Sequence, residues 1–254
     1  MPAAIIGGTG IYALPGLDLE TRVISTPFGD VEVQRGDEIV FLNRHARIGA
    51  KGHSVPPHRI NYRANIKALQ MLGVKRVCGA FAVGLMNTNL DFTPPVLLSD
   101  FIDMTSGRAH TFFDELNGAA GQAMGHVEMS APFCPSLGQA IKDAAKNAGK
   151  PLKQGGIYIA TNGPRFETPA EIKAYAGMGA DVVGMTLCPE VPLAREAGMS
   201  YAGLALPLNW AAGVKPEITL EHGNIKARQS EMVSLMIKAL AQTKDTDCIP
   251  AKIF

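Results

Sequence analysis

The chain has 254 residues, of which 46% are apolar and 19% are charged, so it can bury a substantial core. Its 24 basic and 23 acidic side chains nearly cancel, which excludes an electrostatic case for binding nucleic acid or a membrane surface. No apolar run approaches the roughly 20 residues of a membrane span. The composition predicts a soluble, globular protein of cytoplasmic location.

The four cysteines are scattered and form no CxxC pair, which favours reduced thiols over a disulfide framework. They are Cys78, Cys134, Cys188 and Cys248. Two loop histidines, His53 and His58, lack a carboxylate or cysteine partner at metal-ligand spacing. The sequence therefore predicts no metal site.

Apolar periodicity predicts alternating strands and helices along the chain. The expected strands are 3–6, 39–43, 74–84, 96–102, 156–160, 181–186 and 201–206, with a turn between strands at 26–29. The expected helices are 60–72, 136–148, 168–176, 189–197 and 225–243, and residues 118–125 are expected to form a mobile loop. No repeat or linker divides the chain.

This alternation predicts one α/β domain, residues 1–254, with a central mixed and largely parallel sheet flanked by helices. In such sheets, ligands bind outside the carboxyl ends of the strands. Side chains that follow the predicted strands are therefore the candidates for a site.

The most heavily specified of these connections is the turn 161–171. It carries a cation, an aromatic ring and a carboxylate in succession, Arg165, Phe166 and Glu167. Thr168 and Glu171 have the spacing of a capping box around a helix that begins near them. The turn is either a ligand-binding connection or a well-capped turn with incidental side chains.

Other strand ends carry groups that suit an anion or a heterocycle. Thr9 follows a glycine pair, Thr186 and Asn209 follow later strands, and Arg44-His45 follows strand 39–43. Arg44 can hold an oxyanion with two hydrogen bonds and His45 can donate a third. The alternative for an Arg-His pair is a solvated surface.

Five segments in order make the chain resemble the trimeric purine nucleoside phosphorylase and methylthioadenosine phosphorylase family, from Ile5 to about Leu240. The segments are residues 5–10 (IIGGTG), 43–45 (NRH), 61–65 (NYRAN), 163–168 (GPRFET), and 179–186 (GADVVGMT) followed by Pro189-Glu190.

The resemblance implies the nucleoside phosphorylase fold and phosphorolysis, in which phosphate attacks C1′ of a nucleoside and the purine leaves. It implies that Thr9, Arg44, His45 and Thr186 hold phosphate, with backbone N–H groups near Ala82. It also implies Met185 against the ribose, Phe166 beside the base, and Asn209 as the catalytic residue at the purine. Inorganic phosphate is then a co-substrate, and no metal or organic cofactor is expected.

Two positions favour a 6-oxopurine. Adenine-type members of the family resemble one another in having aspartate at the positions of Asn209 and Ala211. An amide can face O6 and N7 together, because it both donates and accepts. Glu167 can accept the N1–H of hypoxanthine or guanine, whereas N1 of adenine is itself an acceptor.

The sequence predicts the 5′ substituent of the substrate less directly than the base. An ungapped match places Leu220 where nucleoside-cleaving relatives have a histidine, which favours 5′-methylthioinosine. A slip of two residues would restore a histidine, His222, and favour inosine or guanosine.

Two residues depart from the family pattern, Phe81 near the phosphate and Trp210 beside the base. They keep two alternatives open: a methylthioadenosine phosphorylase with an altered base pocket, and a non-catalytic protein that binds purine nucleosides. The resemblance further implies a homotrimer or a dimer of trimers, with His126 of a neighbour closing the site.

Overall fold

The computed structural model describes residues 1–14, 16–49, 55–113, 125–216, 224–248 and 251–254. Its strands are β1 (Ala3–Gly7), β2 (Glu20–Thr26), β3 (Gly29–Arg35), β4 (Ile39–Asn43), β5 (Arg76–Leu85), β6 (Val96–Asp103), β7 (Lys153–Ala160), β8 (Val182–Gly184) and β9 (Ser200–Trp210). Its α-helices are α1 (Tyr62–Met71), α2 (Pro135–Asn147), α3 (Pro169–Gly177), α4 (Leu187–Glu196) and α5 (Ile225–Gln242). Two short 3₁₀ helices are η1 (Pro57–Arg59) and η2 (Asp245–Asp247).

The strands form one mixed sheet in the order β2-β3-β4-β1-β5-β8-β7-β6-β9. Because β9 also pairs with β5, five strands close into a ring of β5, β8, β7, β6 and β9. The pairs β1–β4, β1–β5, β5–β9, β6–β7 and β7–β8 are parallel. The pairs β5–β8 and β6–β9 are antiparallel, so β6, β7 and β8 run opposite to β1, β4, β5 and β9. The site forms where the carboxyl ends of β1, β4, β5 and β9 meet.

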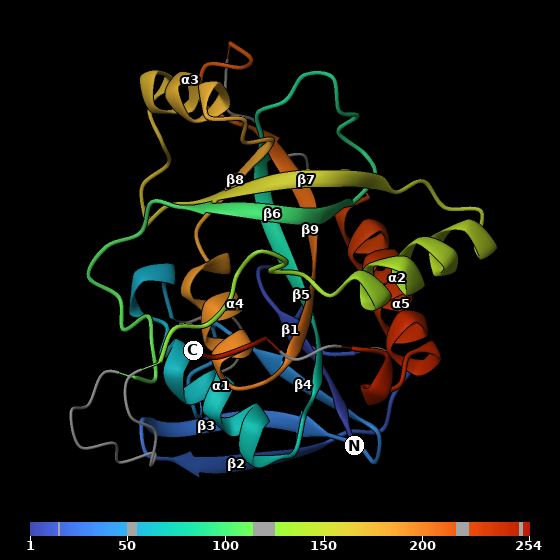
Figure 1. Cartoon of the computed structure of the whole chain (residues 1–254). Coiled ribbons are helices and arrows are strands. Elements are labelled where there is room, and N and C mark those ends of the chain that lie inside the picture. The colour runs from blue at the N-terminus through green and yellow to red at the C-terminus, as the bar shows by residue number, and fades with distance from the viewer. Residues whose placement is uncertain (15, 50–54, 114–124, 217–223, 249–250) are drawn as a thin grey trace.

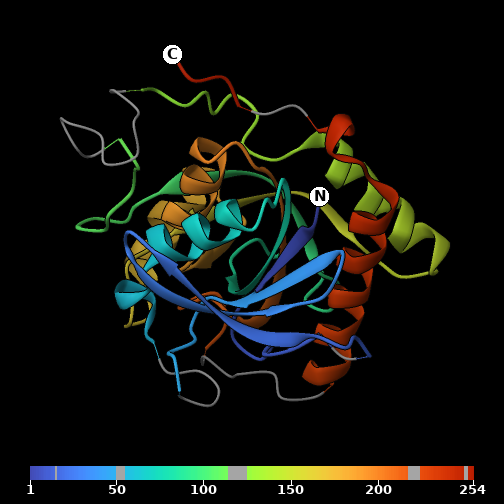
Figure 2. The ribbon, with the colours of Figure 1, turned by 90° about the horizontal axis from the view of Figure 1, so that it is seen from below.

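Helices cover both faces of the sheet. Helices α2 and α5 pack against each other on one side, and α1 and α4 pack together on the other (Figures 1 and 2). Helix α3 lies apart from these pairs, next to the ends of β7 and β8 (Figure 1). Among the described residues, no helix is long and apolar enough to cross a membrane.

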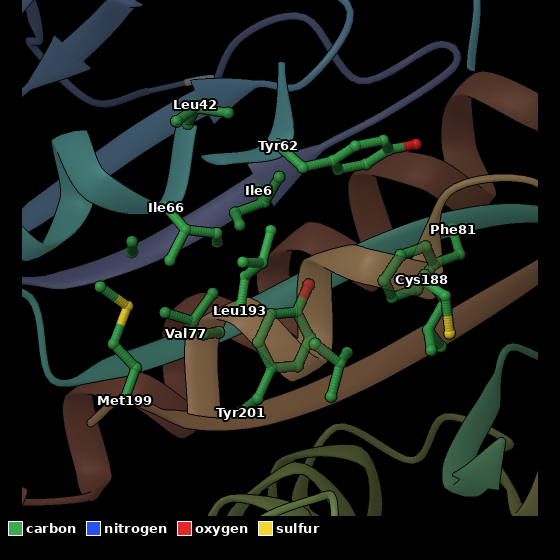
Figure 3. Close-up of a cluster of buried hydrophobic side chains, with 14 of the residues drawn as sticks. Ile6, Leu42, Tyr62, Ile66, Val77, Phe81, Cys188, Leu193, Met199 and Tyr201 are labelled. Atoms are coloured by element: carbon green, nitrogen blue, oxygen red, sulfur yellow. The ribbon is translucent and has the colours of Figure 1, made fainter. Parts of the chain in front are cut away.

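One hydrophobic core cluster fills the space between the sheet and the pair α1 and α4, and a second packs α2 and α5 against the sheet. Figure 3 shows Ile6 of β1, Val77 of β5 and Tyr201 of β9 pointing toward Ile66 of α1 and Leu193 of α4, and all five side chains are fully buried. Burial of large apolar side chains at roughly 1.5–3 kcal/mol each is the main force holding the helices on the sheet. The strands that carry the site are thereby fixed relative to one another.

The predicted fold class is confirmed, and each predicted strand and helix has a counterpart, with the same bounds for strand 39–43 and shifted bounds for the others. Strands β2 and β3, on either side of the predicted turn at 26–29, had not been assigned individually. Strand β9 continues to Trp210, four residues beyond the predicted end, because Pro207 faces β5 without interrupting the pairing. Of the loop expected at 118–125, only residue 125 lies within the described part of the chain.

Candidate active site

A cavity of about 280 Å³ lies at the carboxyl ends of β1, β4, β5, β8 and β9. It brings together most of the residues that the sequence singled out. These are Thr9, Arg44, His45, Ala82, Phe166, Glu167, Met185, Thr186, Asn209 and Ala211. His126 does not line this cavity within the chain, and Leu220 and His222 lie outside the described residues.

Arg44 and His45 are buried, with only 2% and 3% of their surfaces exposed, so they are not the solvated pair that was the alternative. The chain makes room for the guanidinium by placing Gly8 beside it, because a Cβ there would lie 2.4 Å from Nη1 of Arg44. Arg44 donates through Nε and Nη2 to the carboxylate of Glu190 at 2.8 and 2.9 Å. The hydroxyl of Tyr201 also donates to Glu190.

The expectation that Arg44 holds an oxyanion with two hydrogen bonds is not met in this structure. A guanidinium has five N–H donors, and Arg44 also uses Nη1 for the carbonyl of Ala80 at 2.6 Å and Nη2 for that of Ile6 at 3.3 Å. Four of its donors are therefore engaged by the described residues. Burial lowers the pKa of Arg44, but the charge and hydrogen bonds of Glu190 outweigh this and raise the pKa above its usual value.

The imidazole of His45 is oriented by a backbone carbonyl. Its Nδ1 lies 2.7 Å from the oxygen of Val55, and because a carbonyl only accepts, Nδ1 carries the proton. In the neutral ring, Nε2 is then a hydrogen-bond acceptor, and it donates only once the ring is protonated. His45 can thus exchange a proton with an acidic O–H in the cavity.

The segment that carries Met185 and Thr186 is held by a cation that sequence reasoning missed. Arg108 donates to the carbonyls of Met185 and Cys188 at 2.9 and 2.5 Å, and to that of Asn162 at 3.0 Å. It therefore ties the end of β8 to the end of β7. Thr186 itself precedes α4, whose first turn is irregular because Cys188 and Pro189 have non-helical backbone angles.

The turn after β7 presents Phe166 and Glu167 to the cavity. Phe166 is half exposed at 53%, whereas Glu167 is 9% exposed. The hydroxyl of Thr161 donates to Oε1 of Glu167 at 2.6 Å, and Oε2 receives no hydrogen bond from the described residues. One carboxylate oxygen is thus fixed by the protein and the other is available to a ligand.

The second part of the same turn, residues 168–171, caps the start of α3, as the sequence predicted. Thr168 accepts from the backbone N–H of Glu171, and Glu171 accepts from that of Thr168, which completes the predicted capping box. Arg165 pairs with Glu171 through two bonds of 2.8 and 2.7 Å on the surface. Arg165 therefore takes no part in lining the cavity.

A bulge in β9 sets the direction of Asn209. Val83 of β5 faces Pro207, but Gly84 faces Asn209, so Leu208 is an extra residue in β9. Nδ2 of Asn209 donates to the carbonyl of Trp210 at 2.9 Å, which identifies the amide nitrogen. A second N–H and the amide oxygen remain for a ligand.

The two residues that depart from the family pattern do not line the cavity. Phe81 is 1% exposed, and its ring lies 4.6 Å from the guanidinium carbon of Arg44. Trp210 packs against Phe92, with ring centroids 5.6 Å apart, and Lys215 lies over its face. Phe81 thus supports Arg44 from behind, and Trp210 does not enter the base pocket.

A second, larger hollow of about 560 Å³ lies at the opposite ends of β1, β4 and β5. The cation in its wall, Arg76, is already bonded to Asp245 at 2.7 Å and to backbone carbonyls. It therefore lacks the convergent, available donors of the first cavity. Among the described residues, no group of three or more His, Cys, Asp or Glu side chains is placed to hold a metal ion.

Comparison with known proteins assigns the chain to an enzyme family. The family model described as "Phosphorylase superfamily" matches residues 2–242, which is nearly the whole chain. The chain belongs to the phosphorylase superfamily.

Individual relatives within this superfamily are nucleoside phosphorylases. A 6-oxopurine nucleoside phosphorylase of Pyrococcus furiosus is 44% identical over 240 residues, covering 92% of this chain and 86% of that protein. A probable S-methyl-5′-thioinosine phosphorylase of Methanopyrus kandleri is 46% identical, covering 83% and 79%. The solved structure of a methylthioadenosine phosphorylase from Schistosoma mansoni with adenine is 31% identical with a TM-score of 0.84, covering 94% and 90%.

The enzyme is therefore a pentosyltransferase of the purine nucleoside phosphorylase type. This assignment favours a catalyst over the alternative of a non-catalytic nucleoside-binding protein. The substrate that it prefers depends on the side chains of the cavity.

Proposed function

We propose that the enzyme cleaves 6-oxopurine nucleosides with phosphate, releasing hypoxanthine or guanine and a ribose 1-phosphate or its 5-methylthio analogue. The observation that carries this proposal is the carboxylate of Glu167, 9% exposed and with Oε2 available in the cavity wall. An ionised carboxylate only accepts hydrogen bonds, and a 6-oxopurine offers it N1–H. Adenine presents an acceptor at N1, which would face Glu167 with no proton between them.

Asn209 lines the same cavity as Glu167, and its amide can donate a hydrogen bond, which an ionised carboxylate cannot. Its second Nδ2–H donates to N7 of the leaving purine, whose negative charge grows as the glycosidic bond breaks. Because this bond strengthens only toward the transition state, it lowers the barrier more than it tightens substrate binding. Asn209 is accordingly the proposed catalytic residue.

Phosphate is proposed to bind at the opposite end of the cavity, near Thr9, Arg44, His45 and Thr186, with Ala82 contributing its backbone. Since Glu190 and two carbonyls engage most of the Arg44 donors, Arg44 supplies one N–H and a fixed geometry. The two threonine hydroxyls and His45 supply the other contacts. In neutral His45, Nε2 can accept a hydrogen bond from the P–OH of monohydrogen phosphate, which favours binding of this form.

Met185 also lines the cavity and is proposed to contact the ribose. Phosphate held beneath C1′ then attacks as the purine departs. Because both reactants are already positioned, the entropic part of the activation barrier is lower. No residue in this scheme requires a metal or an organic cofactor.

The 5′ end of the substrate is the finer part of the proposal. Leu220, outside the described residues, favours an apolar 5′-methylthio group, and we propose 5′-methylthioinosine as a preferred substrate with inosine and guanosine close behind. We also propose a homotrimer or a dimer of trimers in which the neighbour's His126 closes the cavity, since this residue does not reach the cavity of its own chain. Mass measurement in solution tests the assembly.

A substrate panel tests the proposal. The purified enzyme is incubated with phosphate and each of inosine, guanosine, 5′-methylthioinosine, adenosine and 5′-methylthioadenosine, and the released bases are separated by chromatography. Hypoxanthine and guanine should be released much faster than adenine. Release of adenine alone would overturn the proposal.

Methylthioadenosine phosphorolysis is the second candidate, because a solved methylthioadenosine phosphorylase shares the fold at a TM-score of 0.84. Glu167→Gln separates the two. The amide keeps an acceptor for Thr161 and can turn an N–H toward N1 of adenine, so it should lower kcat/KM for inosine while sparing adenosine. Equal losses for both nucleosides would mean that Glu167 does not read the base.

A further inference from the structure

Two cysteines far apart in sequence lie together, away from the active site. Cys134 immediately precedes α2, and Cys248 follows η2. Their sulfur atoms are 3.0 Å apart, within hydrogen-bonding distance, although the two cysteines are 114 positions apart in the sequence. Both thiols are free, and their residues are 4% and 7% exposed.

The surroundings of Cys134 favour its thiolate. The S–H of Cys248 contributes most, and the N–H groups of Leu137 and Ser136 at the start of α2 add to it, as does the hydroxyl of Ser200. Together they lower the pKa of Cys134, whereas the same contact and burial raise that of Cys248. A thiolate at a helix N-terminus is the reactive form of cysteine.

A buried cation nearby lacks a full set of acceptors. Arg195 of α4 is 6% exposed and donates through Nη1 to the carbonyl of Met199. Its Nε has no hydrogen-bond partner among the described residues. Its charge is attracted to negative charge on either Cys134 or Cys248. The site thus combines two apposed sulfurs with a cation that stabilises the attacking form.

We propose that Cys134 and Cys248 form a covalent modification site, a disulfide that a hydroperoxide closes and a thiol reductant reopens. The Cys134 thiolate attacks a peroxide oxygen, the O–O bond breaks, and a sulfenic acid forms as hydroxide leaves and takes up a proton. The Cys248 sulfur then attacks the sulfenic sulfur, the S–S bond forms, and the hydroxyl departs with the Cys248 proton as water. Two thiols lose two electrons, and hydrogen peroxide becomes two waters.

The cross-link would fasten the C-terminal segment to the body of the protein. Beyond Cys248, the N–H of His126 donates to the carbonyl of Phe254 and the N–H of Glu128 to that of Lys252, both at 2.9 Å. The last residues therefore run beside the segment 125–130 (Figures 1 and 2). Closing the disulfide should increase the protection of the His126 and Glu128 amides from hydrogen exchange.

Peptide mapping of the full-length protein tests the site. Trypsin cuts after Lys and Arg, which places the four cysteines on four different peptides, with Cys134 on 109–142 and Cys248 on 245–252. The protein is treated with hydrogen peroxide, alkylated and digested without reductant. The expected product is these two peptides joined with the loss of two hydrogens, and it should disappear with dithiothreitol. Oxidation should raise the apparent Tm by roughly 5–10 °C, reversibly.

Cys248→Ser is the matched control, because a serine hydroxyl can still donate a hydrogen bond to Cys134 but cannot form the disulfide. It should show neither the joined peptide nor the rise in Tm, while the Cys188 peptide remains alkylated in both proteins. Complete alkylation of Cys134 and Cys248 after a peroxide treatment that oxidises free cysteine would overturn the proposal, as would a link from Cys134 to Cys78. The peptide map of the wild-type protein tests the proposed disulfide even if the Cys248→Ser variant does not fold.

Discussion

The substitution Glu190→Gln tests whether the buried ion pair holds the anion end of the site. Arg44 and Glu190 have side chains 1% exposed, and Glu190 accepts two bonds from Arg44 and one from Tyr201. Glutamine has the same shape but no charge, and its NH₂ group would face an N–H of Arg44. Breaking a buried pair in this way costs about 3–5 kcal/mol, because the remaining charge is left buried and unpaired.

That loss is large beside a typical total stability of about 5–15 kcal/mol, and it corresponds to a fall in Tm on the order of 10 °C. Urea unfolding at one fixed protein concentration measures it, with the m-value checked for constancy. Because Arg44 loses its fixed orientation, the KM for phosphate should rise more than the KM for the nucleoside.

The control is Glu171→Gln, which removes the surface ion pair with Arg165. The side chain of Glu171 is 31% exposed and that of Arg165 is 66% exposed. Glutamine still serves in the capping box, and solvent already screens this pair. Its stability should stay close to that of the wild type. If the two variants lose equal stability and both leave the KM for phosphate unchanged, the reasoning about Glu190 is refuted.

Other substitutions test the base and ribose ends of the cavity. Thr161→Val removes the hydrogen bond to the Glu167 carboxylate and should lower kcat/KM for inosine by roughly 5–20-fold. Thr161→Ser keeps a hydroxyl and should have the kcat/KM of the wild type. Both variants should cleave 1-methylinosine, which lacks N1–H, at equal rates. Asn209→Asp should shift the adenosine-to-inosine ratio of kcat/KM toward adenosine by roughly 10–100-fold, measured from the released bases. Gly163→Ala should cost about 1–2 kcal/mol and raise the nucleoside KM, since φ is +61° there and the new Cβ would lie 2.4 Å from Sδ of Met185; an unchanged Tm would contradict this.

Local pattern was sufficient to predict the helices and every strand except β2 and β3, which were not assigned individually. Ten of the cavity residues were predicted from strand ends together with the family resemblance, which alone supplied Ala82 and Met185. Apolar periodicity and caps are encoded within a few residues of each element, as the capping box of Thr168 and Glu171 illustrates. Strand ends were informative because parallel strands deliver their carboxyl ends to one edge of the sheet. The roles of the residues at that edge remain predictions.

Local sequence pattern did not predict contacts between residues that are far apart in the chain. The partner of Arg44 lies 146 residues away, and its only local signal is a carboxylate within the apolar stretch around Glu190. The bulge that directs Asn209 depends on the register between β5 and β9, which no single segment determines. Likewise, the position of Cys248 beside Cys134 follows from the path of the whole chain.

The ring of β5, β8, β7, β6 and β9 also bears on how the molecule folds. Its last strand enters between β5 and β6, so the ring closes only after residues 200–210 have been synthesised and have docked. Contacts of such large sequence separation slow folding, because the cost of closing the loop comes before the gain from pairing. The cavity is lined by residues from Thr9 to Ala212, so a chain truncated before β9 would lack Asn209 and Ala211 as well as the strand that completes the ring. Activity should therefore return late in refolding, after the secondary structure has formed.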